Sequence, residues 1–510
     1  MKSDTERISG IEERYAEDLV GKLACFDRII IFGTLTGLRY VGAVNRELSC
    51  LQLGAFDLKT FAQPLTDALR QRAEALAEEH GVKITYLPNW RVDKEEIAQA
   101  CLRERGAHPG LVCILSAIEN CQTYQARKGG RAGQKPWIKA CPGRCLHYYF
   151  YFFDADLGLI HLRVPTWIPM RVHFCLNGHA WLERRLRTGG VHARSVDNAL
   201  VEVGDWKKGG ELSAAPPMEW LEERLQSYIA RCCPHAERFG GYYLSLSQVE
   251  LSLDLVLRSE TVARDLCGAL VRQAILGLRA SDVARFFGHQ FSAEAEMTAR
   301  FNAVAEGVLC MRHWLNHQSL KIYHKGAVLR LEATSYDVTF YKHHREVVKR
   351  DGTKEWRVAP LKKSLYSLGT LFGLMEATCR RYLEWLSQLE DPRIGRHNLD
   401  EITRPKRDEA RRSWRGFNFF AADDHHVLVT ALRGEGLLSG WTNKRLRRAL
   451  GAVWTPGRVS RILRRLREHG LIHRVAKTFK YYITKLGLRA LTAALKLREH
   501  VILPTLDPAI

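Results

Sequence analysis

The sequence predicts a multidomain protein with α/β and α+β regions and a C-terminal winged helix. Three observations support this fold class. The chain has 510 residues, which exceeds the roughly 250–300 residues over which one hydrophobic core grows. Short apolar runs alternate with amphipathic helical segments through most of the chain. The last hundred residues follow another pattern, in which three helices precede a two-stranded β-wing.

The composition is that of a folded protein. Hydrophobic residues make up 46% and charged residues 26% of the chain, which excludes wholesale disorder. We expect no membrane partner, because no run of about 18 uncharged apolar residues occurs and the N-terminus, Met1-Lys-Ser-Asp, is polar. Thirteen cysteines are scattered along the chain, which favours reduced thiols and a cytoplasmic location.

Residues 1–205 are expected to form an N-terminal α/β region with an aromatic hairpin. Periodicity predicts its elements in order: helices at 3–24, 59–80 and 93–105, buried strands at 26–33, 84–87 and 111–117, then hairpin strands at 145–153 and 159–164 and a further strand at 170–178.

The aromatic hairpin carries seven successive aromatic or imidazole side chains, from His147 to Phe153. Alternate residues of a strand face opposite sides. Either both faces are covered by the core, or one face offers stacking platforms for nucleic-acid bases. We favour the two-sided core strand.

Two groups of residues in the N-terminal region suggest a metal site, and each has a structural alternative. Asp27 opens a buried strand, where a nuclease of the RNase-H type holds a metal, and Glu119 and Asp154 are further acids of that kind. A single acid before an apolar strand is common, so we favour a structural role. Cys145 and His147, with Cys141 before them and Cys232-Cys233-Pro-His235 far along the chain, offer zinc ligands, but their spacing matches no standard zinc motif.

Residues 211–390 are expected to form a central α+β region after a linker at 207–210. The sequence predicts a long strand at 240–257, strands at 319–323 and 328–334, a charged loop at 343–357, and helices at 217–233, 260–277, 280–287 and 365–388.

The central strands carry the candidate catalytic residues Asp254, Tyr323 and Glu332 at alternating positions. If the strands are adjacent, these side chains share one face. Asp254 and Glu332 would then hold Mg²⁺ through hard oxygen ligands, and Tyr323 would act as a nucleophile on a phosphodiester. The alternative is structural: Glu332 pairs with Arg330 or Lys321, and Tyr323 makes a core hydrogen bond.

The order of these strands, at 248–254, 316–325 and 329–334, resembles the replication initiators of rolling-circle plasmids and filamentous phages. The resemblance covers roughly residues 240–340. It implies metal-dependent DNA nicking through a phosphotyrosine, for which Tyr323 and Tyr336 are the candidates. His324 stands where that family has an aspartate.

Residues 391–415 are expected to be a basic linker, and residues 416–500 a winged-helix nucleic-acid-binding domain. Residues 401–500 contain 23 Lys and Arg against 8 Asp and Glu, an excess of 15 charges in a chain of net charge +21. Such concentration is the footprint of phosphate binding. Val459, Ile462, Leu463 and Leu466 form the buried stripe of the third helix. The expected contacts are Arg458, Arg461, Arg464, Arg465, Arg467, Lys444, Arg445, Lys477 and Lys480.

The whole chain is also similar to an uncharacterised bacterial family. The similarity is carried by residues 26–35, the aromatic hairpin with Cys175-Leu-Asn-Gly178, residues 319–334 and the winged helix. It implies multicopy, mobile-element-like occurrence and no established activity.

The sequence therefore predicts a mobile-element protein that binds DNA or structured RNA. Metal-dependent strand nicking, as by an initiator or a transposase, is a further candidate activity. The alternatives are a non-catalytic RNA-binding subunit of a ribonucleoprotein and a winged-helix transcriptional regulator. The regulator ranks last because it has no need of some 400 upstream residues.

Overall fold

The computed structural model describes residues 10–89, 91–129, 135–196, 198–213, 215–290, 297–305, 308–390, 392–476, 478–503 and 506. The chain forms two compact units. The larger unit comprises Glu17–Cys267 and Val283–Tyr382, and the smaller one comprises Met1–Ala16, Gly268–Asp282 and Leu383–Ile510.

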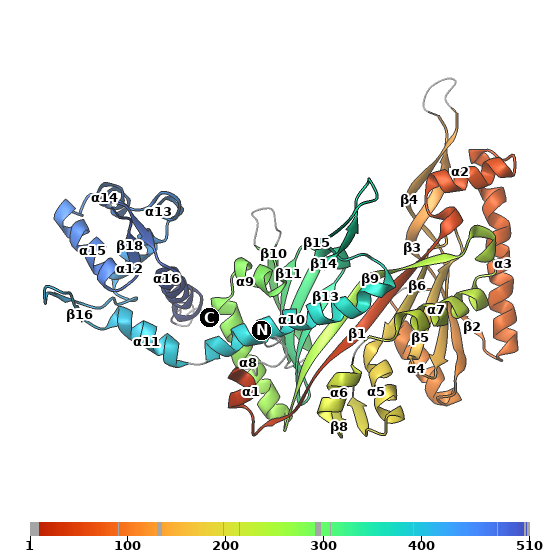
Figure 1. The fold of residues 1–510 in the computed structure, drawn as a ribbon, viewed down its shortest axis with the longest axis horizontal. Helices are drawn as coiled ribbons and strands as arrows, with labels where there is room; N and C mark the ends of the chain where they lie inside the picture. The colour runs from red at the N-terminus through yellow and green to blue at the C-terminus, as the bar shows by residue number, and fades with distance from the viewer. Residues whose placement is uncertain are drawn as a thin grey trace. The chain divides into compact units, whose positions relative to one another are not determined.

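A single eleven-stranded sheet organises the larger unit (Figure 1). Its strand order is β10-β11-β12-β13-β9-β1-β6-β5-β4-β3-β2. Neighbours are antiparallel, except that β2 and β3 are parallel. The strands are β1 (Leu19–Leu35), β2 (Ile84–Tyr86), β3 (Gly110–Arg127), β4 (Trp137–Asp154), β5 (Gly158–Pro165), β6 (Val172–Asn177), β9 (Tyr242–Leu257), β10 (Met297–Ala305), β11 (Val308–Leu315), β12 (Gln318–Lys325) and β13 (Val328–Ser335).

Strand β1 joins the two regions that the sequence analysis separates. It pairs with β9 on one side and with β6 on the other. The expected boundary between residues 205 and 211 therefore does not divide the sheet. The expected helix at 3–24 is also corrected, since α1 covers only Gly10–Arg14, β1 begins at Leu19, and residues 3–9 lie outside the described ranges. Pairing with β9 along nearly the whole strand overrides local helix propensity.

The aromatic hairpin is a two-sided core strand, as favoured from the sequence. Tyr148 to Phe153 are each at most 7% exposed. Tyr149, Tyr151 and Phe153 pack in a cluster with Ala98 of α4 (Lys94–Arg105). On the alternate face, the Phe152 ring lies 4.7 Å from that of Tyr228 in α7 (Met218–Cys232). Both faces are thus occupied by the protein's own side chains.

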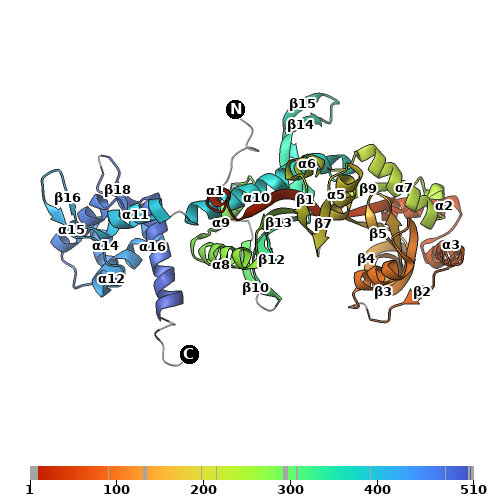
Figure 2. The ribbon, with the colours of Figure 1, turned by 90° about the horizontal axis from the view of Figure 1, so that it is seen from below.

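Helices cover both faces of the sheet around β1 (Figures 1 and 2). Cys25 and Phe26 are successive residues of β1 and face opposite sides. Cys25 packs with Leu182 of α5 (Gly178–Thr188). The Phe26 ring lies 5.1 Å from that of Phe372 in α10 (Leu368–Glu390). The remaining helices of the first 400 residues are α2 (Val41–Cys50), α3 (Leu58–Glu79), α6 (Trp206–Leu212), α8 (Glu260–Gly277), α9 (Ala280–Phe286) and α11 (Pro392–Thr403).

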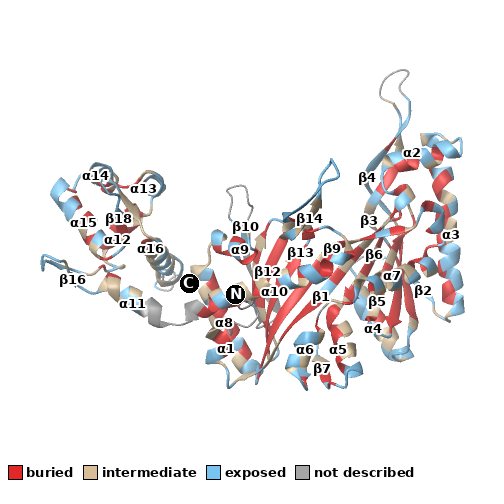
Figure 3. Ribbon diagram, viewed as in Figure 1, coloured by how far each residue is buried: buried red, intermediate tan, exposed pale blue. Residues whose placement is uncertain are grey.

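Three segments expected to be irregular are ordered. The expected linker at 207–210 lies within α6. The expected loop at 343–357 is a hairpin of β14 (Lys342–Val348) and β15 (Lys354–Pro360), which turns where Thr353 donates hydrogen bonds to Asp351. The expected linker at 391–415 contains α11 and the short strands β16 (Lys406–Arg407) and β17 (Ser413–Trp414). Figure 3 shows that the β14–β15 hairpin is largely exposed, whereas the central strands of the sheet are buried. The charged residues of these segments therefore indicated exposure to solvent and not irregular structure.

Residues of the segment from Ile402 to Leu491 build a core of their own from helices and a small hairpin. Thr455 caps α15 and Pro456 occupies its first turn, as helix starts favour. Val459, Leu463 and Leu466 are buried with Val427 and Trp441. The elements are α12 (Ala422–Ala431), α13 (Gly434–Ser439), α14 (Asn443–Leu450), α15 (Pro456–Glu468), β18 (Ile472–Arg474), β19 (Tyr481–Ile483) and α16 (Lys485–Leu497).

Besides the large sheet, the described residues form two-stranded sheets of β14 with β15, β16 with β17, β18 with β19, and β7 (Ala193–Val196) with β8 (Ala199–Val203). Among the described residues, we find no helix whose apolar stretch is long enough to cross a bilayer.

Candidate functional site

The three candidate catalytic residues lie on neighbouring strands of the sheet. Strands β12, β13 and β9 are consecutive in the strand order. The register places Arg330 opposite both Asp254 and Tyr323, and Glu332 opposite Lys321. Since residues opposite each other share a face, Asp254, Tyr323 and Glu332 point to one side of the sheet, as the sequence analysis expects.

Arg330 occupies the centre of this polar cluster and holds Asp254. Its side chain is 2% exposed, and its Nε and Nη2 donate to the two carboxylate oxygens of Asp254, each at 2.7 Å. Nη2 also donates to the carbonyl of Asn198 at 2.8 Å. This bidentate geometry is the strong form of a charge-assisted hydrogen bond. Asp254 is therefore already neutralised by a cation of the chain.

Glu332 is held in the same way by β12. Lys321 Nζ forms an ion pair with its Oε1, and the Tyr323 hydroxyl donates to its Oε2 at 3.0 Å. Although burial opposes ionisation, Lys321 keeps the pKa of Glu332 below its usual value. Burial, followed by the charge of Glu332, raises the pKa of Tyr323. A Mg²⁺ ion at this place would have to displace Lys321 or Arg330, and Tyr323 remains a protonated donor at neutral pH.

Asp27 completes the cluster, which it reaches from β1. Its carboxylate accepts a hydrogen bond from the Asn198 amide and lies 3.6 Å from Arg330 Nη1. Burial raises the pKa of Asp27 to about 6, with Arg330 acting in the opposite direction. Asn198 adopts a left-handed φ of 61°, a conformation that asparagine tolerates better than most residues. Asp27 stands out in the sequence, but its partners do not, since they come from distant segments of the chain.

Ser252, His179 and Asp27 lie together without forming a hydrolytic triad. Ser252 Oγ is 3.2 Å from His179 Nε2, and Asp27 faces the same nitrogen at 4.0 Å. A triad needs the acid on Nδ1, and in the described structure this nitrogen has no hydrogen-bond partner. Ser252 is also fully buried. Burial lowers the pKa of His179, which leaves the imidazole neutral.

Glu119 and Asp154 are committed to other contacts. Glu119 accepts from Tyr149 at 2.6 Å and pairs with Lys94 at 3.0 Å. Asp154 accepts from Arg224 and Tyr228 at 2.8 and 2.6 Å. The described contacts thus give each acid a structural role.

Arg465 is the main correction among the expected nucleic-acid contacts. It is 5% exposed and donates to both oxygens of Asp424, at 2.7 and 2.9 Å. It also donates to the carbonyl of Arg415 at 2.9 Å, and its guanidinium lies 3.8 Å from the centre of the Phe417 ring. The expectation that Arg465 lies on the helix surface is wrong, because its position on α15 faces the segment before α12.

The other expected cations differ in the ion pairs and hydrogen bonds that they form with the rest of the chain. Arg464 donates to the nearly buried Asp408 at 2.9 Å. Arg458 and Arg467 are exposed and form ion pairs with Asp423 and Glu468, each at 2.8 Å. Arg445 is exposed and donates to Ser439 at 2.9 Å. Lys444, Arg461 and Lys480 are exposed, and no ion pair to them occurs in the described structure. Lys477 lies outside the described residues.

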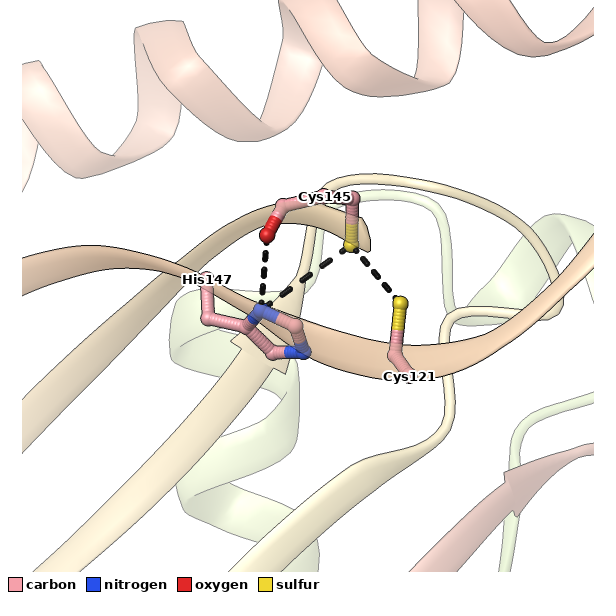
Figure 4. A group of neighbouring side chains, drawn as sticks. All are labelled: Cys121, Cys145 and His147. Carbon is pink, nitrogen blue, oxygen red and sulfur yellow. Dashed lines mark hydrogen bonds between the residues drawn. The ribbon is translucent and has the colours of Figure 1, made fainter. Parts of the chain in front are cut away.

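A third group of chemically active side chains lies on the β3–β4 hairpin. Ligand atoms of Cys121, Cys145 and His147 all lie within 4.8 Å of one another (Figure 4). Of the zinc ligands suggested by the sequence, Cys145 and His147 are in this group. His235 is instead buried against Tyr242, at 2.9 Å. Cys121 was missed, since it lies on the opposite strand.

Comparison of the chain with protein-family models, with curated proteins and with solved structures finds no match. The functional argument therefore rests on the chain's own geometry and charge.

Replacing Arg465 by alanine should destabilise the C-terminal module, because Asp424 would be left buried and unpaired. Breaking a buried ion pair costs about 3–5 kcal/mol. Amide hydrogen exchange in α12 and α15, followed by mass spectrometry, should become much faster. Arg461→Ala is the matched control on the same helix, and it should change stability by no more than about 0.5 kcal/mol. Equal protection in the two variants would contradict the structural role of Arg465.

The contribution of Asp27 to the stability of the larger unit should fall as pH rises toward about 6. Folding raises the pKa of this carboxyl to about 6, from about 3.9 in an unfolded chain. At this site the folded state therefore binds an extra proton between these values, and the contribution declines with pH by up to about 3 kcal/mol. The stability of the wild type minus that of Asp27→Asn, measured by thermal unfolding at each pH, should therefore fall between roughly pH 4 and pH 7. An identical pH profile in wild type and variant would refute this assignment.

Proposed function

We propose that the chain is a nucleic-acid-binding protein and that residues 416–500 form a winged helix that carries the contact surface. The single observation that supports this most is the concentration of exposed cations on α14, the N-terminal half of α15 and the β18–β19 hairpin. Five of these side chains, which we take as the proposed face, are exposed and have no ion pair within the described structure: Lys444, Arg447, Arg448, Arg461 and Lys480.

The order of elements supports a groove-reading role for α15. In helix-turn-helix proteins the second helix of the motif lies in the major groove, and its N-terminal residues reach the base edges. Here α14 and α15 are tied by Asn443, whose amide donates to the carbonyl of Pro456 and to Ser460 Oγ, each at 2.8 Å. Arg465 fixes the C-terminal half of α15 in the core, and the ring nitrogens of His469 beyond it lie 2.9 and 3.0 Å from the carbonyl oxygens of Glu401 and Arg415. The half that carries Arg458 and Arg461 stays open.

The exposed ion pairs on α15 do not oppose this role. Arg458 and Arg467 are paired with exposed or half-exposed acids, and such surface pairs contribute only about 0–1 kcal/mol. A phosphate can therefore replace Asp423 or Glu468 as the partner of these guanidinium groups at small cost. We assign Arg464 and Arg465 to the fold and not to the contact surface.

A hollow beside α15 combines tryptophan and arginine side chains. It has a volume of about 200 Å³ and is lined by Trp414, Trp454, Arg415, Arg458 and Arg461, together with Asp423, Asp424, Ile462 and Arg465. The guanidinium of Arg458 lies 3.9 Å from the centre of the Trp454 ring. Aromatic rings flanked by arginines are the pattern with which proteins hold unpaired nucleotides.

We do not extend the proposal to strand nicking. Asp254 and Glu332 each hold a cation of the chain, and Tyr323 is a hydrogen-bond donor to Glu332. A tyrosine nucleophile needs a base or a metal that lowers its pKa, whereas burial here raises it. The mobile-element origin stays a prediction from the sequence resemblance.

Charge reversal at Lys444 and Arg461 together should greatly weaken binding to duplex DNA or structured RNA. Each phosphate contact that is lost should lower the slope of log affinity against log salt by about 0.9 on B-form duplex and about 0.7 on a single strand. Fluorescence anisotropy of the full chain over a series of salt concentrations measures the affinity and its dependence on salt. The slope change on a duplex and the slope change on a single strand indicate which form of nucleic acid is bound.

Arg489→Glu is the matched control for this experiment. Arg489 is an exposed arginine of α16, outside the proposed face, and its reversal changes the net charge as much as a single reversal at Lys444 or Arg461. If the control weakens binding as much as either single reversal at Lys444 or Arg461, attraction to net charge explains the binding and the proposed face is wrong.

A further inference from the structure

We infer that Cys121, Cys145 and His147 form a zinc site on the β3–β4 hairpin. This site is independent of the nucleic-acid-binding face. It offers two thiolates and one imidazole, the ligand types that bind Zn²⁺ in proteins.

The two strands bring the ligands together through their register. Cys121 lies opposite Gly143, and Cys145 lies opposite Glu119, so the two cysteines are diagonal neighbours across β3 and β4. His147 follows Cys145 by two residues and faces the same side of the sheet. Figure 4 shows the two thiols and the imidazole converging from the two strands.

The distances are near those of a tetrahedral zinc centre. Cys121 Sγ lies 3.2 Å from Cys145 Sγ, and Cys145 Sγ lies 3.9 Å from His147 Nδ1. Bond lengths of about 2.3 Å to sulfur and about 2.0–2.1 Å to nitrogen at tetrahedral angles require roughly 3.5–3.8 Å between ligand atoms. Small side-chain rotations would bring all three atoms into range.

The position of Arg163 defines what else must change when the ion binds. Its Nη2 lies 3.1 Å from His147 Nε2. His147 Nδ1 lies 3.0 Å from the carbonyl oxygen of Cys145, to which it donates a hydrogen bond that zinc would replace. Zinc on Nδ1 requires the proton of the imidazole to lie on Nε2, where it would meet the guanidinium. Arg163 has another acceptor, because Glu119 Oε2 lies 3.2 Å from the same Nη2. Metal binding would therefore transfer Arg163 from His147 to Glu119, which would remain as the neighbouring negative charge.

Three protein ligands leave a fourth position for water or another small ligand. Structural zinc sites are closed by four protein ligands, whereas sites with three keep an exchangeable position. No further Cys, His, Asp or Glu of the described chain joins the group. Cys121 and Cys145 are half-exposed and His147 is buried, so the ion would enter from the side of the thiols. We expect a zinc ion with one exchangeable ligand at the surface of the hairpin.

Cobalt titration of the reduced, metal-stripped full chain tests this site. We expect a thiolate-to-cobalt charge-transfer band that saturates at one ion per chain and disappears when Zn²⁺ is added. Cys121→Ser and Cys145→Ser should each abolish the saturable band, and His147→Gln should weaken it. The matched control is Cys141→Ser, which removes a half-buried thiol on the same strand that lies against Thr123. This control should retain the band.

Two results would overturn the site. One is the absence of a saturable band in the reduced wild-type chain. If air oxidation also links Cys121 to Cys145 in that case, the pair is only a redox couple. The other is a band that survives in Cys121→Ser, which would place the bound metal on other cysteines.

Discussion

The buried ion pair between Arg465 and Asp424 decides which part of α15 is held in the core. It joins the C-terminal half of the helix to the start of α12 and to the carbonyl groups of Arg415 and Gly416. Burial opposes the charge of Asp424, but hydrogen bonds from Arg465 keep its pKa below the usual value. With this end fixed in the core, Arg465 is withdrawn from solvent, and the contact surface that we propose is limited to the N-terminal half of α15, to α14 and to the hairpin.

The larger unit is organised by a comparable constraint. Arg330 is buried in the middle of a sheet, and it is stabilised only because Asp254, Asp27 and the carbonyl of Asn198 surround it. These partners come from β9, β1 and the β7–β8 turn, so a single guanidinium ties together segments that are far apart in the sequence. A cluster of this kind specifies the register of β1, β9 and β13, since a shift by one residue would move every charge to the opposite face.

Much of the local structure could be predicted from the sequence, and the long-range pairing could not. The helix at 59–80 and the strands around Asp254 and Glu332 are found because hydrophobic periodicity is strong there. The union of β1 with β9, and the contacts of Cys121 with Cys145, depend on strand pairing that no local pattern reveals. Arg465 was misplaced for a related reason: a helical stripe identifies apolar core positions, but an arginine that is buried with its own carboxylate looks like a surface residue.

Mapping of cross-links between the full chain and bound nucleic acid tests the central claim most directly. Ultraviolet cross-linking to a bound duplex or hairpin, followed by mass spectrometry of the attached peptides, locates the contact surface without any mutation. We predict cross-linked residues within 443–461 and in the β18–β19 hairpin, with few beyond Arg464 on α15. Cross-links confined to the sheet of the larger unit, or no bound nucleic acid at all, would contradict the account.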